Sequence, residues 1–175
     1  QALAVSLANR GNALALCGRN LEKLKQTQNL CGTANTQCFS TDIQSPLARE
    51  QLFQHINQTW GSLDILINNA GIVNVGKLEE TCAASIDTMI STNLIAPIML
   101  ARTFLPLLRH SKNAAILNMG SMFGDIAFPY FGVYSATKFG LRGFSDGMRR
   151  ELAHENIKVI YAAPRATQTN ASKEY

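Results

Sequence analysis

The sequence predicts an α/β protein with a doubly wound parallel sheet in a single domain. Its 175 residues, 46% of them hydrophobic, suffice for one domain with a sizeable core. Short apolar runs alternate with longer amphipathic segments, which is the order of strands and helices in such a fold. The runs are continuously apolar, as is typical of strands buried on both faces of a parallel sheet. The predicted strands cover residues 13–17, 36–40, 63–67, 114–119 and 158–163.

The segments between these strands carry the residues that start and stop helices. Asn20 and Ser45 are suited to the N-cap, and Pro46 to the first helical position. Gly11 is suited to ending the first helix. The predicted helices cover about residues 1–10, 20–29, 45–60, 82–108 and 130–154.

Composition argues against several classes of partner. The net charge is +4, but the sixteen Lys and Arg residues are scattered, whereas a nucleic-acid site clusters them. The four cysteines lack metal-ligand spacing, which indicates free thiols in a reducing compartment and no metal. No apolar stretch reaches the roughly 18 residues of a membrane helix. We therefore expect a cytoplasmic protein that binds neither nucleic acid nor membrane.

Small and polar residues follow every predicted strand. Ligands of open parallel sheets bind beyond the carboxyl ends of the strands, so these segments are candidates for a binding site. They are Gly18-Arg19-Asn20, Thr41-Asp42-Ile43, Asn68-Asn69-Ala70-Gly71, Gly120-Ser121 and Pro164-Arg165-Ala166-Thr167.

Ser121, Tyr134 and Lys138 form a pattern suited to proton transfer. Tyr134 and Lys138 are four residues apart, so they share one face of a helix. An isolated tyrosine has a pKa near 10, and a nearby ammonium favours the phenolate. Ser121 follows a strand and is suited to hydrogen-bonding the oxygen of a carbonyl or alcohol. Taken alone, the Tyr–Lys pair is better explained as an ordinary amphipathic helix face, and only together with Ser121, its position after a strand and the other motifs does it favour a site.

Together, the motifs resemble the classical short-chain dehydrogenase/reductase family over residues 1 to about 169. The resemblance rests on CGRN at 17–20, Asp42, NNAG at 68–71, Asn93 in STNLI, Ser121, and YSATK at 134–138. It implies a Rossmann fold and a catalytic tetrad of Asn93, Ser121, Tyr134 and Lys138. Tyr134 would be the general acid or base, and Ser121 would orient the substrate oxygen. Lys138 would hold the nicotinamide ribose, and Asn93 would position a water that relays protons to Lys138.

The resemblance also implies the cofactor contacts. Asn69, Ala70 and Gly71 would line the cofactor, and Asp42 with Ile43 would meet the adenine. The segment of Pro164, Arg165 and Thr167 would lie near the nicotinamide, together with Tyr134 and Lys138. Arg165 replaces the glycine of the family's Pro-Gly pair, and Gly120 stands where many relatives carry a serine.

Arg19 indicates which dinucleotide is used. NAD sites place an acidic residue near the ribose 2′-hydroxyl, whereas an arginine accommodates a 2′-phosphate. Gly18 occupies the acidic position and Arg19 follows it, so NADP(H) is favoured over NAD(H).

The family's first strand and glycine-rich loop have no counterpart in the sequence. That strand lies inside the sheet, and we expect about 10–20 further residues before Gln1 in the working protein. Relatives also continue beyond TQTNASKEY with a substrate-covering segment. The interpretation is one NAD(P)-binding domain over residues 1–175, incomplete at its N-terminus and its C-terminus.

The predicted function is NADP-dependent transfer of hydride between nicotinamide and a small carbonyl or alcohol substrate. Met122, Phe123, Phe128 and Phe131 would give the pocket an apolar wall, although these side chains are equally suited to the core. One alternative is a 3-oxoacyl-carrier-protein reductase, which a basic patch near the pocket would favour. Another is a catalytically silent dinucleotide-binding or scaffold protein. Helices 82–108 and 130–154 resemble those through which relatives form homodimers and homotetramers.

Overall fold

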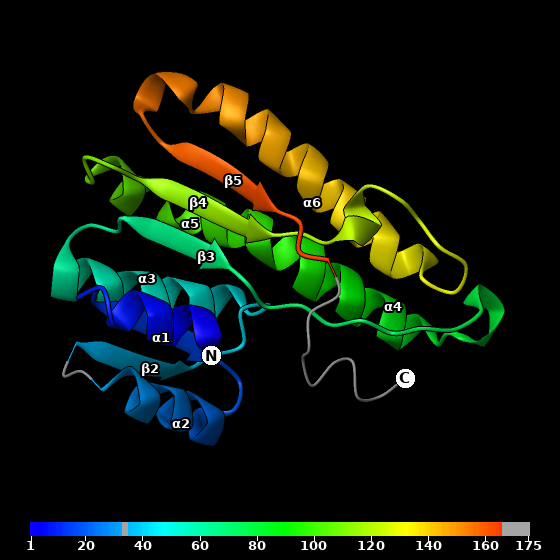
Figure 1. Cartoon of the computed structure of the whole chain (residues 1–175), viewed down its shortest axis with the longest axis horizontal. Coiled ribbons are helices and arrows are strands. Elements are labelled where there is room, and N and C mark those ends of the chain that lie inside the picture. Colours follow the sequence, from blue (N-terminus) through cyan, green and yellow to red (C-terminus); the bar gives the residue numbers. More distant parts are fainter. Residues whose placement is uncertain (33–34, 166–175) are drawn as a thin grey trace. The chain divides into compact units, whose positions relative to one another are not determined.

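The computed structural model describes residues 1–32 and 35–165, in two compact units (Figure 1). The units comprise residues 1–52 and 53–175. All strand pairs are parallel, and strands alternate with helices along the chain, so the α/β prediction with parallel strands is confirmed. The strands are β1 (Leu14–Gly18), β2 (Thr36–Ser40), β3 (Ile65–Asn68), β4 (Ala115–Met119) and β5 (Lys158–Ala162).

In the first unit, β1 pairs with β2, and the helices α1 (Ala2–Ala8) and α2 (Leu21–Cys31) pack against these strands. Asn20 caps α2 as predicted, because its side chain accepts a hydrogen bond from the Lys23 N–H at 2.9 Å. Gly11 takes a left-handed conformation with φ +81° just after α1, which favours glycine over other residues.

Helix α3 (Pro46–Trp60) begins in the first unit and ends in the second. Its start follows the prediction, since the Ser45 hydroxyl accepts a hydrogen bond from the Ala48 N–H at 3.3 Å. In the second unit, Phe53 on this helix meets Phe104 edge to face, with 5.9 Å between the ring centroids.

In the second unit, β4 lies between β3 and β5. Leu66, Ile116 and Val159 are register partners across the three strands, so they share one face of the sheet. The helices α5 (Ala96–Arg109) and α6 (Gly132–Glu151) pack on this face. Their contacting side chains are Ala101, Leu105, Leu108, Phe144 and Met148.

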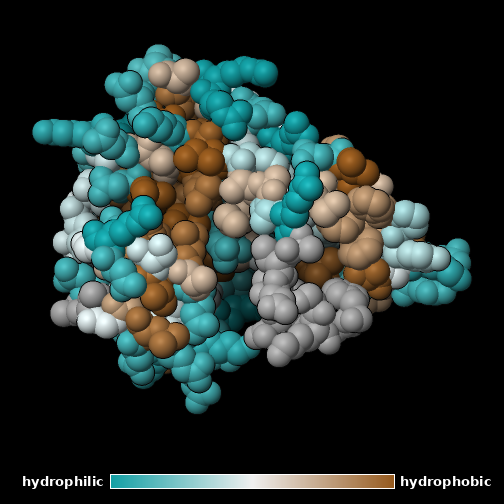
Figure 2. All heavy atoms as spheres, viewed as in Figure 1, coloured by the Kyte–Doolittle hydropathy of each residue, from teal (hydrophilic) through white to brown (hydrophobic). Residues whose placement is uncertain are grey.

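The prediction that the strands are buried on both faces is wrong for this sheet. Ile65 and Ile160 point to the opposite face and are 43% and 46% exposed. Figure 2 shows apolar side chains on the face that Figure 1 turns to the viewer. The physical reason is that α5 and α6 cover only the other face.

The helix predicted over 82–108 contains a wider turn. It consists of α4 (Ala83–Ile90), a π-helical segment (Ser91–Ile95) and α5. A single π turn inside an α-helix frequently marks a functional site, and this one contains the buried Asn93.

The prediction that no apolar stretch is long enough for a membrane helix is wrong for one span, because Ala83–Arg109 is long and apolar enough by length and composition alone. Its side chains at Leu100, Phe104 and Leu108 are buried within the protein, as in the core helix of a folded domain.

Short 3-10 turns complete the second unit. They are Leu78–Glu80, Met122–Gly124 and Ala153–Glu155. The turn Met122–Gly124 connects the end of β4 to the loop before α6, which brings Ser121 to the same end of the sheet as the first turns of α6.

Candidate active site

Ser121 lies immediately beyond β4, in extended backbone at the start of the turn Met122–Gly124. Its side-chain oxygen accepts a hydrogen bond from the Phe123 N–H at 3.3 Å, which fixes the side chain at the cap of the turn. The residue is 9% exposed. Among the residues that the structure describes, no acceptor takes the Ser121 hydroxyl proton, so this proton is available to a substrate oxygen.

Lys138 and Tyr134 lie on the first two turns of α6, as the YSATK motif predicts. The Lys138 ammonium donates to the Met119 carbonyl at 2.9 Å and lies 5.6 Å from the centroid of the Tyr134 ring. Burial lowers the pKa of Lys138 to about 8. The buried ammonium is therefore held between the end of β4 and the phenol.

Phe123 connects Ser121 to Tyr134. Its ring meets the Tyr134 ring edge to face, with 5.6 Å between centroids, and its N–H donates to Ser121. Contacts of this kind favour a fixed ring orientation. The structure thus brings Ser121, Tyr134 and Lys138 together, as the sequence predicted.

Asn93 is 1% exposed, and its side chain makes three hydrogen bonds to described residues. Its oxygen accepts the Ile72 N–H at 2.9 Å. Its amide donates to the Ile72 carbonyl at 2.8 Å and to the Thr137 hydroxyl at 3.2 Å. Asn93 therefore joins the segment after NNAG to α6, and its predicted role in a water relay stays a prediction.

The NNAG segment, residues 68–71, ends beside the side chains of Asn93 and Lys138. A Cβ built on Gly71 would lie 3.5 Å from the Asn93 amide oxygen and 3.7 Å from the Lys138 ammonium. These are ordinary contacts, so space alone does not require glycine there. Asn69 and Ala70 are exposed, whereas Asn68 is buried and donates to the Asn118 side chain at 2.8 Å.

The predicted cofactor residues of the first unit follow β1 and β2. Arg19 is exposed, forms no ion pair with any residue in the described part of the chain, and its carbonyl accepts from the Ser40 hydroxyl at 3.3 Å. Asp42 is exposed and its carboxylate accepts the Gln44 N–H at 3.0 Å. Ile43 is held by its carbonyl, which accepts from the buried Arg49 at 2.7 Å.

The remaining predicted cofactor residues follow β5. Pro164 is half-buried and Arg165 is exposed. Thr167 lies outside the described residues.

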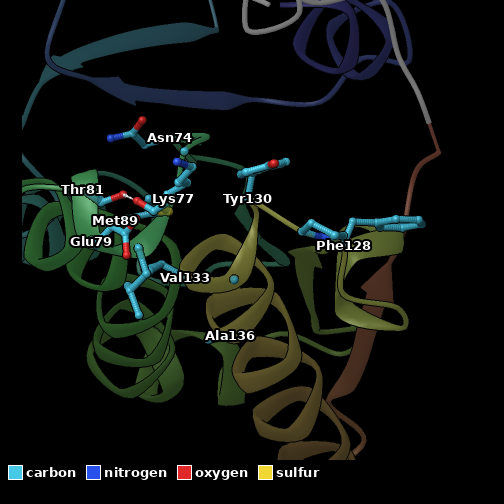
Figure 3. A pocket seen from close by; sticks show the side chains of 13 residues that line it. Asn74, Lys77, Glu79, Thr81, Met89, Phe128, Tyr130, Val133 and Ala136 are labelled. Carbon is cyan, nitrogen blue, oxygen red and sulfur yellow. Dashed lines mark hydrogen bonds between the residues drawn. The ribbon is translucent and has the colours of Figure 1, made fainter.

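Aromatic rings extend from Tyr134 toward a cavity of about 600 Å³ (Figure 3). Phe123 packs on Phe128 and Phe131, with 5.4 and 4.5 Å between ring centroids. Phe128 also lines the cavity, together with Asn74, Lys77, Met89, Tyr130 and Val133. Of the four side chains expected in an apolar wall, Phe128 lines this cavity and Phe123 packs behind it, whereas Met122 and Phe131 are not among the lining residues. Lys77 pairs with Glu80 at 3.3 Å, so the cavity wall has no unpaired lysine or arginine.

One residue of this cluster, Tyr161 on β5, lies outside the motifs predicted from the sequence. Its hydroxyl lies within hydrogen-bonding distance of the Ser121 backbone. The available signal was the pair of glycines flanking the turn after Ser121, Gly120 and Gly124, which leave room for a large neighbour. Among the described residues, no group of three or more His, Cys, Asp or Glu side chains could hold a metal ion.

Comparison with known proteins identifies relatives that share this organisation. An uncharacterised oxidoreductase of Staphylococcus saprophyticus is 30% identical over 165 residues, covering 93% of this chain and 67% of that protein. The dehydrogenase/reductase SDR family member 7B of Mus musculus is 32% identical over 168 residues, covering 93% of this chain and 52% of that protein. The chain thus spans only part of these curated relatives' length.

Solved structures agree in fold. A short-chain dehydrogenase from Streptomyces avermitilis superposes with a TM-score of 0.88 at 28% identity, covering 96% of this chain and 62% of that one. A metagenomic short-chain oxidoreductase in complex with NADP also superposes with a TM-score of 0.88 at 28% identity, covering 95% of this chain and 76% of that one. The fold is therefore Rossmann-like and shorter than in these homologues.

The family model described as short chain dehydrogenase matches residues 1–175. With the parallel α/β fold and the motifs gathered at the strand ends, this match shows that the chain belongs to the short-chain dehydrogenase/reductase family.

Proposed function

We propose that the protein is an NADP(H)-dependent oxidoreductase that interconverts a carbonyl compound and its alcohol. The observation that supports this most is the cluster of Ser121, Tyr134 and Lys138 beyond β4. At one edge of a parallel sheet, Phe123 contacts both Ser121 and the Tyr134 ring, and the buried Lys138 ammonium lies 5.6 Å from the centroid of that ring.

Each side chain has a defined task in the proton transfer. In reduction, Tyr134 gives its proton to the carbonyl oxygen, and in oxidation it takes the proton of the alcohol. Ser121 donates its free hydroxyl proton to the same oxygen and stabilises the developing negative charge. The ammonium of Lys138 stabilises the phenolate left on Tyr134. A bound nicotinamide supplies or accepts the hydride.

The residues at this edge fit a dinucleotide. The Lys138 ammonium makes one hydrogen bond to the described part of the protein, which leaves further N–H donors for ribose hydroxyls beside Gly71. In the first unit, Arg19 is exposed without a carboxylate partner among the described residues, which suits a 2′-phosphate. The Lys138 donors suit either dinucleotide, and the exposed Arg19 favours NADP over NAD.

The aromatic wall favours a substrate with an apolar body. Phe128 connects the cavity of Figure 3 to Phe123, and Phe123 contacts the Tyr134 ring. Among the described residues that line the cavity, Lys77 is the one basic side chain and it pairs with Glu80, so the lining does not form the basic patch that would favour an acyl-carrier protein. We therefore favour a small hydrophobic ketone or aldehyde over a carrier-bound acyl chain.

Exposed apolar side chains support a homo-oligomer. Ile95 in the π-helical segment is 48% exposed and Phe139 on α6 is 43% exposed. Sedimentation velocity of the full-length protein tests this part of the proposal, and a monomer at micromolar concentration contradicts it.

Cofactor titration tests the proposed function. We expect NADPH to raise the melting temperature more than NADH does, because Arg19 offers a charge-assisted contact to the 2′-phosphate. Arg19→Ala should weaken the binding of NADPH about tenfold while leaving the binding of NADH unchanged. Arg10→Ala, at another exposed arginine of the same unit, is the matched control and should change neither affinity.

A panel of hydrophobic ketones and aldehydes with NADPH oxidation as the readout then tests the reaction. Binding of NADPH with carbonyl-dependent oxidation supports the proposal. Failure to bind either dinucleotide favours the silent scaffold instead.

A further inference from the structure

We propose that Tyr161 is a positioning residue of this site, whose phenol hydroxyl ties the backbone of Ser121 to the backbone of Lys138. The inference rests on the proposed function, because it assigns Tyr161 a task for the residues that act there. Tyr161 itself lies on β5, outside the motifs of the sequence analysis.

The ring of Tyr161 occupies the space above two glycines. A Cβ built on Gly120 would lie 2.1 Å from Cζ of this ring, and one built on Gly124 would lie 2.1 Å from its hydroxyl oxygen. Real Cβ atoms essentially never come so close. Tyr161 in this position therefore requires glycine at both ends of the turn that holds Ser121.

The hydroxyl lies among three backbone groups of the site. It accepts the N–H of Ser121 at 3.4 Å. Its single proton is shared between the carbonyl of Ser121 at 3.3 Å and the carbonyl of Lys138 at 3.4 Å. Burial raises the pKa of Tyr161, so the hydroxyl keeps this proton near neutral pH.

The hydrogen bond from the Ser121 N–H to the Tyr161 hydroxyl lies just beyond the carboxyl end of the β4–β5 pair. The last ladder bond between β4 and β5 runs from the Gly120 N–H to the Ala162 carbonyl at 2.7 Å. Beyond it, the Ser121 N–H has the Tyr161 hydroxyl as its acceptor among the described residues. Tyr161 thus continues the β4–β5 pairing by a side chain and connects it to α6 at Lys138.

The alternative is that the ring only fills space, and Tyr161→Phe separates the two cases because it keeps the ring and removes the hydroxyl. Hydrogen exchange of the Ser121 amide reports on the contact without any substrate. We expect this amide to exchange at least about tenfold faster in the variant. With an active carbonyl substrate, kcat should fall about tenfold or more while KM stays within about twofold, since a misplaced donor affects the reacting geometry more than binding.

Ser111→Ala is the matched control. It removes a hydroxyl that bonds Asp64 at the opposite end of the same sheet. We expect neither the Ser121 amide exchange nor kcat to change.

A steric exchange tests the packing separately. Gly120→Ser alone should lower the melting temperature sharply, because the new side chain overlaps the Tyr161 ring. Adding Tyr161→Ala makes room, so the double variant should melt above Gly120→Ser alone. Equal melting temperatures for these two variants overturn the proposed packing.

The outcomes separate this inference from the proposed function. Unchanged amide exchange in Tyr161→Phe overturns the positioning role, and so does faster exchange with unchanged kcat. A wild-type protein that binds no dinucleotide refutes the proposed function, and the exchange result then decides whether the contact exists.

Discussion

At the amino ends of β3, β4 and β5, charged side chains remain near solvent and pair with each other, whereas at the carboxyl ends a cation is buried without a carboxylate. Arg109 donates two hydrogen bonds to Glu155, at 2.6 and 2.9 Å, just before β5 begins. Lys138 is 5% exposed and has the carbonyl of Met119 as its acceptor among the described residues.

The difference between the two ends of the sheet shows in the pKa values of Glu155 and Lys138. The Arg109 guanidinium lowers the pKa of Glu155, so that pair favours its charged forms. Burial instead lowers the pKa of Lys138 to about 8, so the surroundings of this amine disfavour its charge. At one end of the sheet the two charges favour each other at the surface, and the other end carries an unfavourable buried charge in the place where chemistry is proposed.

Apart from loss of the Tyr134 hydroxyl, the largest effect should come from Ser121→Ala, which removes the donor at the chemical end of the sheet. We expect kcat to fall about 10²–10³-fold, as when one donor to a developing oxyanion is lost. NADPH affinity should stay unchanged in a fluorescence titration. Wild-type turnover in this variant would remove Ser121 from the mechanism.

Lys138→Met should stabilise the protein at neutral pH, by up to about 3 kcal/mol. The folded pKa of Lys138 lies below its ordinary value of 10.5, so between pH 8 and 10.5 the unfolded chain binds more protons than the folded one. The free energy of unfolding of the wild type should therefore rise with pH across this window, and that of the variant should lack this rise.

Urea unfolding at several pH values measures this effect. Lys158→Met, at an exposed lysine of β5, is the matched control and should keep the wild-type pH dependence. A parallel pH dependence in Lys138→Met and wild type would show that the buried amine is not the cause.

Ser145→Ala tests the buried series of hydrogen-bonded side chains formed by Asn68, Asn118 and Ser145. The Ser145 hydroxyl accepts from the Asn118 amide at 2.8 Å, and Asn118 accepts from Asn68 at 2.8 Å. Losing the hydroxyl leaves a buried donor unpaired, which should lower the free energy of unfolding by about 1–3 kcal/mol. A variant as stable as the wild type in urea would show that water or a rearrangement replaces the contact.

The smallest effect should come from Arg109→Ala at the amino ends. Its pair with Glu155 is on the surface, where solvent screens the charges. Both kcat and the midpoint of urea unfolding should stay close to wild type. A large loss of activity would show that the two ends of the sheet are coupled.

The features that could be predicted from sequence are those that depend on residues close together in the chain. Asn20 and Ser45 act through neighbours three residues away, so their capping roles follow from the sequence alone. Tyr134 and Lys138 lie one helical turn apart, so their proximity was also a local prediction.

The missed features depend on partners distant in the chain. Tyr161 is one residue of an apolar strand, and its role appears only when Gly120 and Ser121, 41 and 40 residues earlier, lie beside it. The π turn at Asn93 likewise places a side chain against Ile72, which no periodicity of the helix indicates. The exposed face at Ile65 and Ile160 depends on which helices cover the sheet, and an apolar run alone does not specify this.

The central claim is that the Tyr134 phenol moves the proton in an NADP-linked carbonyl reaction. Tyr134→Phe keeps the ring against Phe123 and removes only the hydroxyl, so NADPH should bind as in the wild type. Carbonyl-dependent NADPH oxidation should fall about 10²–10⁴-fold, the usual contribution of a general acid. NADPH oxidation at the wild-type rate in this variant would contradict the account.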